Sequence, residues 1–327
     1  MKRAIRRCAT VLAVGVVVLV GVAGPVQARP VTEASGVAMR WAASTPEEVR
    51  RVVAYWTPQA MRDAAALDVL VGTAEAGRRM REEARASTTI VPPRRPVGPM
   101  MFPNGGGVWT GGGAVVGAAG RVFFTVNGSN SSCSATAVSS ANRSTVITAG
   151  HCVKITGRFH QNWVFVPGYD NGNAPFGTWT ARQVFLTPQW MSSEDLSFDI
   201  GAVVVNDLDG ALLTDVVGGQ GVAFNQSRGQ DMYAFGWPAA GPYDGTTMIY
   251  CSGTTFDATL TTGIGMYCDL TAGASGGAWL QQFDESSGTG VLASVNSYKM
   301  NFVPDYVFGP YFGMDAQNLY DIAETAQ

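Results

Sequence analysis

Histidine is scarce in this chain, which has only His151 and His160 among 327 residues. No two cysteines have C-x-x-C spacing, so a zinc site is not expected, and no other metal or cofactor is indicated. Charged residues make up only 14% of the chain and hydrophobic residues 46%. That balance excludes a disordered protein and predicts a buried core.

Long apolar runs are missing except at the N-terminus. Four basic residues (Lys2, Arg3, Arg6 and Arg7) precede an apolar run over residues 11–23, and small residues follow at Val26-Gln27-Ala28. This order is typical of a secretory signal peptide, so residues 1–28 are expected to be removed. The run is short for a membrane span, and no later segment reaches the required length. We therefore expect a secreted protein with no membrane attachment after signal cleavage.

Charge is unevenly distributed along the chain. Residues 29–117 carry eleven arginines and eight acids, whereas residues 118–327 carry seven basic residues against seventeen acids. The acidic two-thirds argues against nucleic acid as a partner. The arginine-rich part is interpreted as a pro-segment and linker, residues 29–117, that covers the acidic domain; an ordinary solvated charged segment is the alternative.

Four cysteines follow the signal peptide, namely Cys133, Cys152, Cys251 and Cys268. An even number in an exported chain indicates disulfides, and three pairings are possible. We favour the neighbouring pairs, Cys133–Cys152 and Cys251–Cys268. Each would close a loop of roughly 20 residues, worth about 3 kcal/mol in the chain-entropy model.

The pro-segment has helix signals. Thr45-Pro46-Glu47-Glu48 provides a cap, a proline in the first turn and two acids, which predicts a helix start. A second helix is expected over residues 64–86. A proline-rich stretch follows at residues 92–96, and a glycine-rich linker is expected at residues 105–113.

Beyond residue 118 the pattern favours short strands. The first cluster is expected at residues 121–126, 134–138, 144–148, 163–166, 179–185 and 200–205. The second is expected at residues 232–235, 246–251, 265–269, 277–281 and 290–297. Two such clusters predict an all-β fold with two small barrels, residues 118–207 and 208–327, and a closing helix over residues 313–325.

Gly273-Ala274-Ser275-Gly276-Gly277 is the sharpest local motif. A serine hydroxyl needs an adjacent base and donors for the developing oxyanion, and glycines let backbone N–H groups turn toward it. The motif also matches the G-x-S-x-G elbow of α/β-hydrolases, and a plain glycine turn is a third possibility. The hydrolase order requires a histidine after the serine, and none follows Ser275. The order His, Asp, Ser stays open.

His151 is the candidate base because it ends the strand-like run Val146-Ile147-Thr148-Ala149-Gly150 and precedes Cys152. A disulfide at that cysteine would fix the imidazole near its nucleophile. Asp199 is the candidate orienting acid, since it opens an apolar strand. His160 is interpreted as a structural histidine.

Together, Thr148-Ala-Gly-His151-Cys152, Phe198-Asp199-Ile200-Gly201 and the Ser275 motif resemble the chymotrypsin-like serine peptidases. The variety most similar is the secreted bacterial, glutamyl-endopeptidase-like one. The likeness covers about residues 118–310.

The resemblance implies two six-stranded antiparallel β-barrels and a triad of His151, Asp199 and Ser275. It implies an oxyanion hole from the N–H groups of Gly273 and Ser275, an acyl-enzyme, and a strand at Ser297, Tyr298 and Lys299 that pairs with an extended substrate. The expected partners are a protein or peptide substrate and the chain's own pro-segment, on a monomeric enzyme. A catalytically idle binding protein and an esterase of the same fold are the alternatives.

Specificity is left open by this sequence. Ala274 stands where trypsin-type enzymes carry an aspartate for the new N-terminus, and no histidine lies near Asn296, as strict glutamate specificity would require. Asp269 lies six residues before Ser275, where it could select basic side chains. Lys299 could instead favour acidic or short ones.

Overall fold

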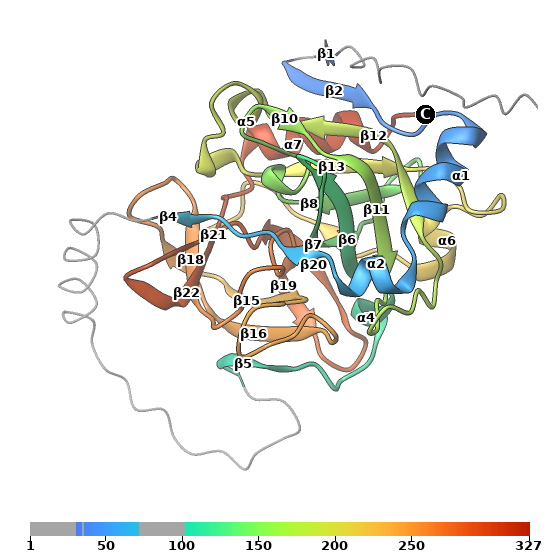
Figure 1. Ribbon diagram of the computed structural model, residues 1–327. Coiled ribbons are helices and arrows are strands. Elements are labelled where there is room, and N and C mark those ends of the chain that lie inside the picture. Colours follow the sequence, from blue (N-terminus) through green and yellow to red (C-terminus); the bar gives the residue numbers. More distant parts are fainter. Residues whose placement is uncertain (1–30, 35, 72–101) are drawn as a thin grey trace, which may run out of the picture.

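The computed structural model describes residues 31–34, 36–71 and 102–327 (Figure 1). The expected signal peptide and the proline-rich stretch at residues 92–96 lie outside the described residues. Among the described residues no helix is long and apolar enough to cross a membrane.

The first barrel is a closed antiparallel sheet that β12 and β13 complete by pairing with each other. Nearly every residue along its strands is buried, as short Val/Thr/Ser-rich runs require when a sheet curls around its own core. In sheet order the strands are β12 (Trp179–Leu186), β11 (Gln161–Pro167), β6 (Ala119–Val126), β7 (Ser129–Ala137), β8 (Thr145–Thr148) and β13 (Gly201–Val205).

The strands of the second barrel are divided between two sheets. A six-stranded sheet has the order β14 (Gly221–Val222), β20 (Thr289–Val295), β19 (Ala278–Asp284), β15 (Asp231–Gly236), β16 (Ile249–Thr254) and β5 (Asn104–Val108). A five-stranded sheet has the order β17 (Phe256–Asp257), β18 (Ile264–Tyr267), β22 (Val303–Gly309), β21 (Tyr298–Met300) and β4 (Leu70–Val71).

Both favoured cysteine pairs are disulfides in this structure. Cys133–Cys152 joins β7 to the turn after β8, and Cys251–Cys268 joins β16 to the residue that follows β18. The second bond thus ties the two C-terminal sheets together.

Helices are few, and the chain ends in the expected one, α7 (Met314–Ala323). The others among the described residues are α1 (Pro46–Tyr55), α2 (Pro58–Arg62), α4 (Ala114–Ala118), α5 (Pro188–Ser193) and α6 (Leu213–Val217). The expected start of α1 is present. The Thr45 side chain accepts from the Glu48 N–H, and the Glu48 carboxylate accepts from the Thr45 N–H. The two β-sheet regions and the few short helices confirm the predicted all-β class.

The N-terminal segment lies along both halves of the molecule (Figure 1). Strands β1 (Val31–Ala34) and β2 (Val37–Trp41) extend the first sheet beyond β12. After α1, the buried ring of Trp56 packs on Phe123 of β6, with 5.5 Å between the ring centroids. The chain then crosses from α2 past β7 to β21.

Two local predictions were wrong. The helix expected over residues 64–86 is absent in its described part, where β3 (Ala65–Ala66) pairs with β7 and β4 pairs with β21; the remainder lies outside the described residues. Backbone pairing with these two strands outweighs the helix propensity of the alanines and leucines. The first part of the linker expected at residues 105–113 is instead strand β5, which ends at Val108 and pairs with β16. Glycine permits this contact, since a Cβ on Gly106 would lie 1.8 Å from Asp269 Oδ1.

Candidate active site

His151 and Asp199 form a fully buried pair, each with 0% of its surface exposed. Nδ1 of the imidazole lies 2.7 Å from Asp199 Oδ2, and the His151 backbone N–H donates to Oδ1 at 2.8 Å. The hydroxyl of Ser297 donates to Oδ2 at 2.5 Å. A carboxylate with three such donors is held in one orientation, and it fixes the ring with its proton on Nδ1 and its lone pair on Nε2.

Neighbouring strands bring this pair together. Asp199 stands just before β13, which pairs with β8 through Gly201 and Thr148, and His151 lies in the short 3-10 turn directly after β8. The disulfide at Cys152 anchors that turn to β7. Two elements that leave the same barrel edge side by side therefore place acid and imidazole in contact, as the sequence motifs indicated.

The loop that carries Ser275 is held against β7 by Ser134. The Ser134 N–H donates to the Ser275 carbonyl at 2.7 Å, and its hydroxyl donates to the Gly273 carbonyl at 2.9 Å. The same hydroxyl accepts from the Trp237 N–H at 2.9 Å. One buried serine of the first barrel thus fixes two segments of the second, a role that no sequence motif indicates.

Gly276 allows the loop to approach the histidine turn. Its φ is +80°, and a Cβ there would lie 2.1 Å from Thr148 Oγ1 and 2.4 Å from the Ser134 carbonyl oxygen. Only glycine fits this backbone conformation at this contact. Gly276 thus contacts Thr148, the last residue of β8, and Ser275 directly precedes Gly276. The turn that carries His151 begins just after that strand.

Asn296 stabilises the loop from the other side and was not recognised in the sequence as a site residue. Its Nδ2 donates to the carbonyls of Phe235 and Ala274, both at 2.9 Å, and its Oδ1 accepts from the Trp279 indole at 2.7 Å. All of its side-chain hydrogen bonds are internal, so it positions the loop that carries Ser275. A single Asn-Ser pair in the sequence carries no signal for this.

Ser275 is not hydrogen-bonded to His151 in this structure. Among the described residues His151 Nε2 has no partner, although it is buried. The Ser275 hydroxyl lies 3.5 Å from the carbonyl oxygen of Leu67, and the Gly273 N–H donates to that oxygen at 3.1 Å. A carbonyl from the N-terminal segment thus accepts from one of the two expected oxyanion donors, the Gly273 N–H.

A pocket adjoins Ser275. Its lining comes from the nucleophile loop, from the residues leading into and along β21, and from the N-terminal segment: Asp68, Leu270, Thr271, Ala274, Ser275, Asn296, Ser297, Tyr298, Lys299 and Val307. Lys299 Nζ donates to the Leu270 carbonyl at 2.8 Å, and burial lowers the pKa of its ammonium. The Tyr298 ring stacks on Phe308.

Asp269 is not part of this lining. Both of its carboxylate oxygens accept from the hydroxyl of Tyr243, at 2.8 and 2.9 Å. Three of the four expected substrate-binding residues thus gather at the pocket, namely Ser297, Tyr298 and Lys299. Asp269 does not line it, although its charge acts on the nearby Lys299.

A cluster of Cys133, His151 and Cys152 has the composition of a metal site, with its ligand atoms within 4.8 Å of one another. The two cysteines are bonded to each other, and a disulfide offers no thiolate. The cluster is therefore a disulfide beside a histidine.

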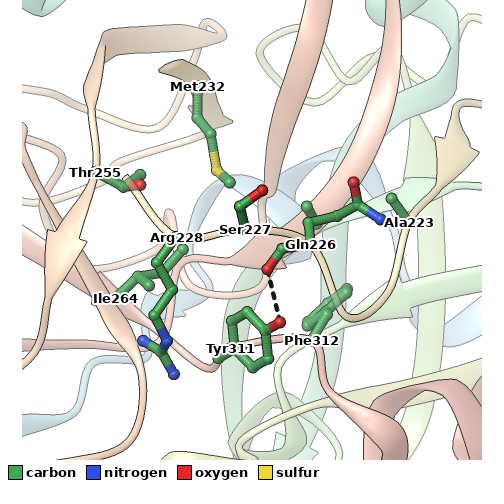
Figure 2. A pocket seen from close by; sticks show the side chains of 10 residues that line it. Ala223, Gln226, Ser227, Arg228, Met232, Thr255, Ile264, Tyr311 and Phe312 are labelled. Carbon is green, nitrogen blue, oxygen red and sulfur yellow. Dashed lines mark hydrogen bonds between the residues drawn. The ribbon is translucent and has the colours of Figure 1, made fainter. Parts of the chain in front are cut away.

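A second hollow lies between the loop of residues 223–228 and the chain before α7 (Figure 2). Its polar groups already have partners: the Tyr311 hydroxyl donates to the Gln226 carbonyl at 2.7 Å, and Arg228 lies over the Tyr311 ring at 4.4 Å and pairs with Asp257. No residue of the candidate triad lines it. We assign it no role in the chemistry.

His160 is a structural histidine in this geometry. Its ring stacks on Phe124 with 4.2 Å between centroids, and Nε2 lies 2.8 Å from the His151 carbonyl, to which the neutral ring donates. Burial lowers the pKa of His160 to about 4, with the nearby His151 acting in the same direction and the bond to the carbonyl opposing it. It is therefore neutral at pH 7.

This depressed pKa makes a prediction for stability. Below pH 6.5 the unfolded chain binds a proton at His160 that the folded chain refuses until about pH 4, so the free energy of unfolding should fall as the pH drops through that window. His160→Gln should remove this part of the pH dependence. Urea unfolding of both proteins at pH 7, 6, 5 and 4 measures it; parallel curves would contradict the assignment.

Comparison with solved structures gives close agreement with bacterial serine proteases. The protease Anisep from Arthrobacter nicotinovorans is 40% identical, with 65% of this chain and 98% of that one covered and a TM-score of 0.61. The thermostable serine protease AL20 from an extremophilic microorganism is 38% identical over 65% of this chain and all of that one, with a TM-score of 0.62. A Glu endopeptidase, 16% identical with a TM-score of 0.54 over 69% of this chain and 99% of that one, shares the fold.

The chain therefore belongs to the chymotrypsin-like serine peptidases. Its particular relatives are the bacterial enzymes Anisep and AL20, and the expected likeness to the glutamyl-endopeptidase-like group is confirmed at the level of the fold.

Sequence comparison adds little to this. An extracellular metalloprotease of Bacillus subtilis is 31% identical over 70 residues, which are 21% of this chain and 22% of that protein, so the match spans about a fifth of its length. No family model matches the chain.

Proposed function

We propose that this protein is a secreted serine endopeptidase that cleaves peptide bonds through an acyl-enzyme. The observation that carries the proposal is the buried Asp199–His151 pair, in which the imidazole Nε2 has no hydrogen-bond partner among the described residues. Gly276 packs the loop that carries Ser275 against Thr148, the last residue of β8, and the His151 turn follows that strand directly. The bacterial serine proteases of the same fold support it.

In the proposed mechanism His151 Nε2 takes the proton of the Ser275 hydroxyl as that oxygen attacks the peptide carbonyl. Asp199 holds the Nδ1–H and stabilises the imidazolium that forms. The N–H groups of Gly273 and Ser275 donate hydrogen bonds to the carbonyl oxygen and stabilise the negative charge that develops on it. His151 then gives its proton to the leaving amine, and a water molecule activated by the same ring hydrolyses the acyl-enzyme.

The substrate is proposed to lie along β21, with Ser297, Tyr298 and Lys299 as its main-chain partners and the adjoining pocket for one side chain. Ser297 has a second task in this proposal, because its hydroxyl bonds to Asp199. Asp269, hydrogen-bonded to Tyr243, would act on specificity only through its charge near Lys299, which also lies in the field of Asp305.

Digestion of a proteome-derived peptide library tests the function. The processed wild-type enzyme should cut internal bonds, whereas Ser275→Ala and His151→Ala should yield no new termini. Turnover of small esters with no peptide cut would identify an esterase of the same fold. If the processed wild type cleaves neither peptides nor esters but still binds peptides, it is an idle binding protein.

We further propose that the chain from residue 29 to a cut before Asn104 is a pro-segment that is removed outside the cell. β5 pairs with β16 and belongs to the catalytic domain, so the cut is expected before Asn104. Mass spectrometry of the active, secreted enzyme should find an N-terminus between residues 72 and 104. An active enzyme that begins at Arg29 would contradict the proposal.

A further inference from the structure

Residues 65–71, here called the pro-strand, run from β7 to β4 beside β21 (Figure 1) and contact the loop that carries Ser275. At one end Ala65 and Ala66 pair with Ser131 and Ser132 of β7, and the Leu67 N–H donates to the Ser132 carbonyl at 2.9 Å. At the other end Leu70 and Val71 pair with β21. The pro-strand therefore bridges the two halves of the molecule over Ser275.

Its central carbonyl engages the reactive groups directly. The oxygen of Leu67 accepts from the Gly273 N–H at 3.1 Å and lies 3.5 Å from the Ser275 hydroxyl. The next residue, Asp68, is half-buried and forms part of the lining of the pocket beside Ser275. A peptide group thus sits where the proposed chemistry needs one, but it is part of the chain itself.

The direction of the pro-strand decides what this peptide group can do. β4 runs parallel to β21: Lys299 N–H donates to the Val69 carbonyl at 3.1 Å, and Asn301 N–H donates to the Val71 carbonyl at 3.2 Å. In this direction the carbonyl carbon of Leu67 is followed by the nitrogen of Asp68, the residue that enters the pocket.

Cleavage after Leu67 would require that nitrogen to receive a proton from His151 Nε2. In the proposed reaction the pocket receives the side chain of the residue whose carbonyl is attacked. Here the carbonyl bound by the Gly273 N–H belongs to Leu67, whereas the pocket is lined by the following residue, Asp68, so the main chain runs in the reverse order. The Ser275 hydroxyl donates to the Leu67 oxygen instead of to His151. His151 Nε2 therefore has no hydrogen-bond partner among the described residues.

We propose that the surface formed by the β7 edge, Gly273 and β21 binds an extended peptide in the non-cleavable direction, and that its occupant is the pro-strand, which keeps the unprocessed enzyme latent. The inference rests on the proposed function, since it names the ligand of the same site. It also states the chemistry of that ligand: a main chain parallel to β21 with a small or acidic side chain at the pocket.

The pro-strand is short, and its outer part is loosely held. Leu70 is 60% exposed. The carbonyls of its two neighbours, Val69 and Val71, accept hydrogen bonds from the backbone of β21 and of the residue after it. The pro-strand is covalently joined to the catalytic domain only through the chain that precedes Asn104. A cut in that chain makes the pro-segment a separate molecule and so lowers the local concentration of the pro-strand at the site.

The test compares two proline variants of the full chain. Leu67→Pro removes the N–H that bonds to Ser132 at the centre of the pro-strand. Leu70→Pro is the matched control: it is also a leucine-to-proline change, but because residues alternate along a strand its N–H points away from β21. The readout is the rate at which a fluorophosphonate labels the unprocessed and the processed chain, separated by mass on a gel.

The unprocessed wild type and Leu70→Pro should be labelled at least about tenfold more slowly than the processed enzyme, and Leu67→Pro should approach the processed rate. Equal labelling of unprocessed and processed wild type would overturn the inference while the proposed function stands. If the processed wild type is not labelled, the proposed function itself fails. Equal labelling rates for the two proline variants would also contradict the proposal that the pro-strand keeps the unprocessed enzyme latent.

Direction has its own readout. Mass spectrometry at the earliest time of processing should recover the released pro-segment with residues 65–71 intact. A fragment that ends at Leu67 would show that the pro-strand is bound as a substrate and would overturn the reverse orientation.

Discussion

Replacing Asp199 by asparagine should lower kcat by about 10⁴-fold while the protein stays folded. The carboxylate accepts three hydrogen bonds, from the His151 ring, the His151 N–H and the Ser297 hydroxyl. An amide can offer only one oxygen, so at least one of these donors would face an NH₂ group. The ring would lose the acceptor that keeps its proton on Nδ1, and Nε2 would no longer serve as the base.

Steady-state hydrolysis of a peptide ester and of a peptide by the processed enzyme measures this loss. His160→Gln serves as the control, since it alters the other histidine, whose ring bonds only to the His151 carbonyl; its kcat should stay within about tenfold of wild type. A decrease in Asp199→Asn no larger than in the control would remove the acid from the proposed mechanism.

Gly276→Ala is expected to reduce kcat/KM by roughly 10²-fold or more, because misplacement of a reacting group by about 1 Å costs that much. The new Cβ would fall 2.1 Å from Thr148 Oγ1 and 2.4 Å from the Ser134 carbonyl oxygen, so the nucleophile loop must move away from the histidine turn. Gly128→Ala is the matched control. Its φ of +82° imposes the same backbone strain, but no atom lies within 4 Å of the added methyl group.

Activity and urea unfolding should be measured on both glycine variants. Gly128→Ala should lose about 1 kcal/mol of stability through the strained φ and keep its activity. Equal activity of the two variants would show that the close approach of the Ser275 loop to Thr148 is unimportant for catalysis.

Much of the fold could be predicted from the sequence because the strands are short, apolar and bounded by turn residues. The strand expected at residues 179–185 is β12 over Trp179–Leu186, and that at residues 232–235 is β15 over Asp231–Gly236. The helix start at Thr45 depends only on a local cap, so it was also predictable. In each case the deciding interactions lie within a few residues of one another.

The failures share one physical cause. Residues 64–71 have helical composition, but their backbone groups pair with β7 and β21, between 60 and 230 residues away in the chain. β5 is glycine-rich because its backbone packs against Asp269 and Tyr267, which no local pattern reveals. Propensity describes a segment by itself, and these segments are shaped by distant partners.

The residues of the candidate site also differ in whether they could be predicted from the sequence. The motifs around His151, Asp199 and Ser275 could be recognised, since each chemical role demands a particular residue type. Ser134 and Asn296 could not, because serine and asparagine are common and their importance comes from carbonyls of the other barrel or of distant loops. Supporting residues of this kind become visible only once the chain is folded.

The most direct test of the central claim is to treat the processed enzyme with a fluorophosphonate and locate the adduct by tandem mass spectrometry. The account predicts one phosphonylated residue, Ser275, with labelling abolished in His151→Ala and greatly slowed in Asp199→Asn. A stable adduct on another residue, or unchanged labelling of Ser275 when His151 is replaced, would contradict it.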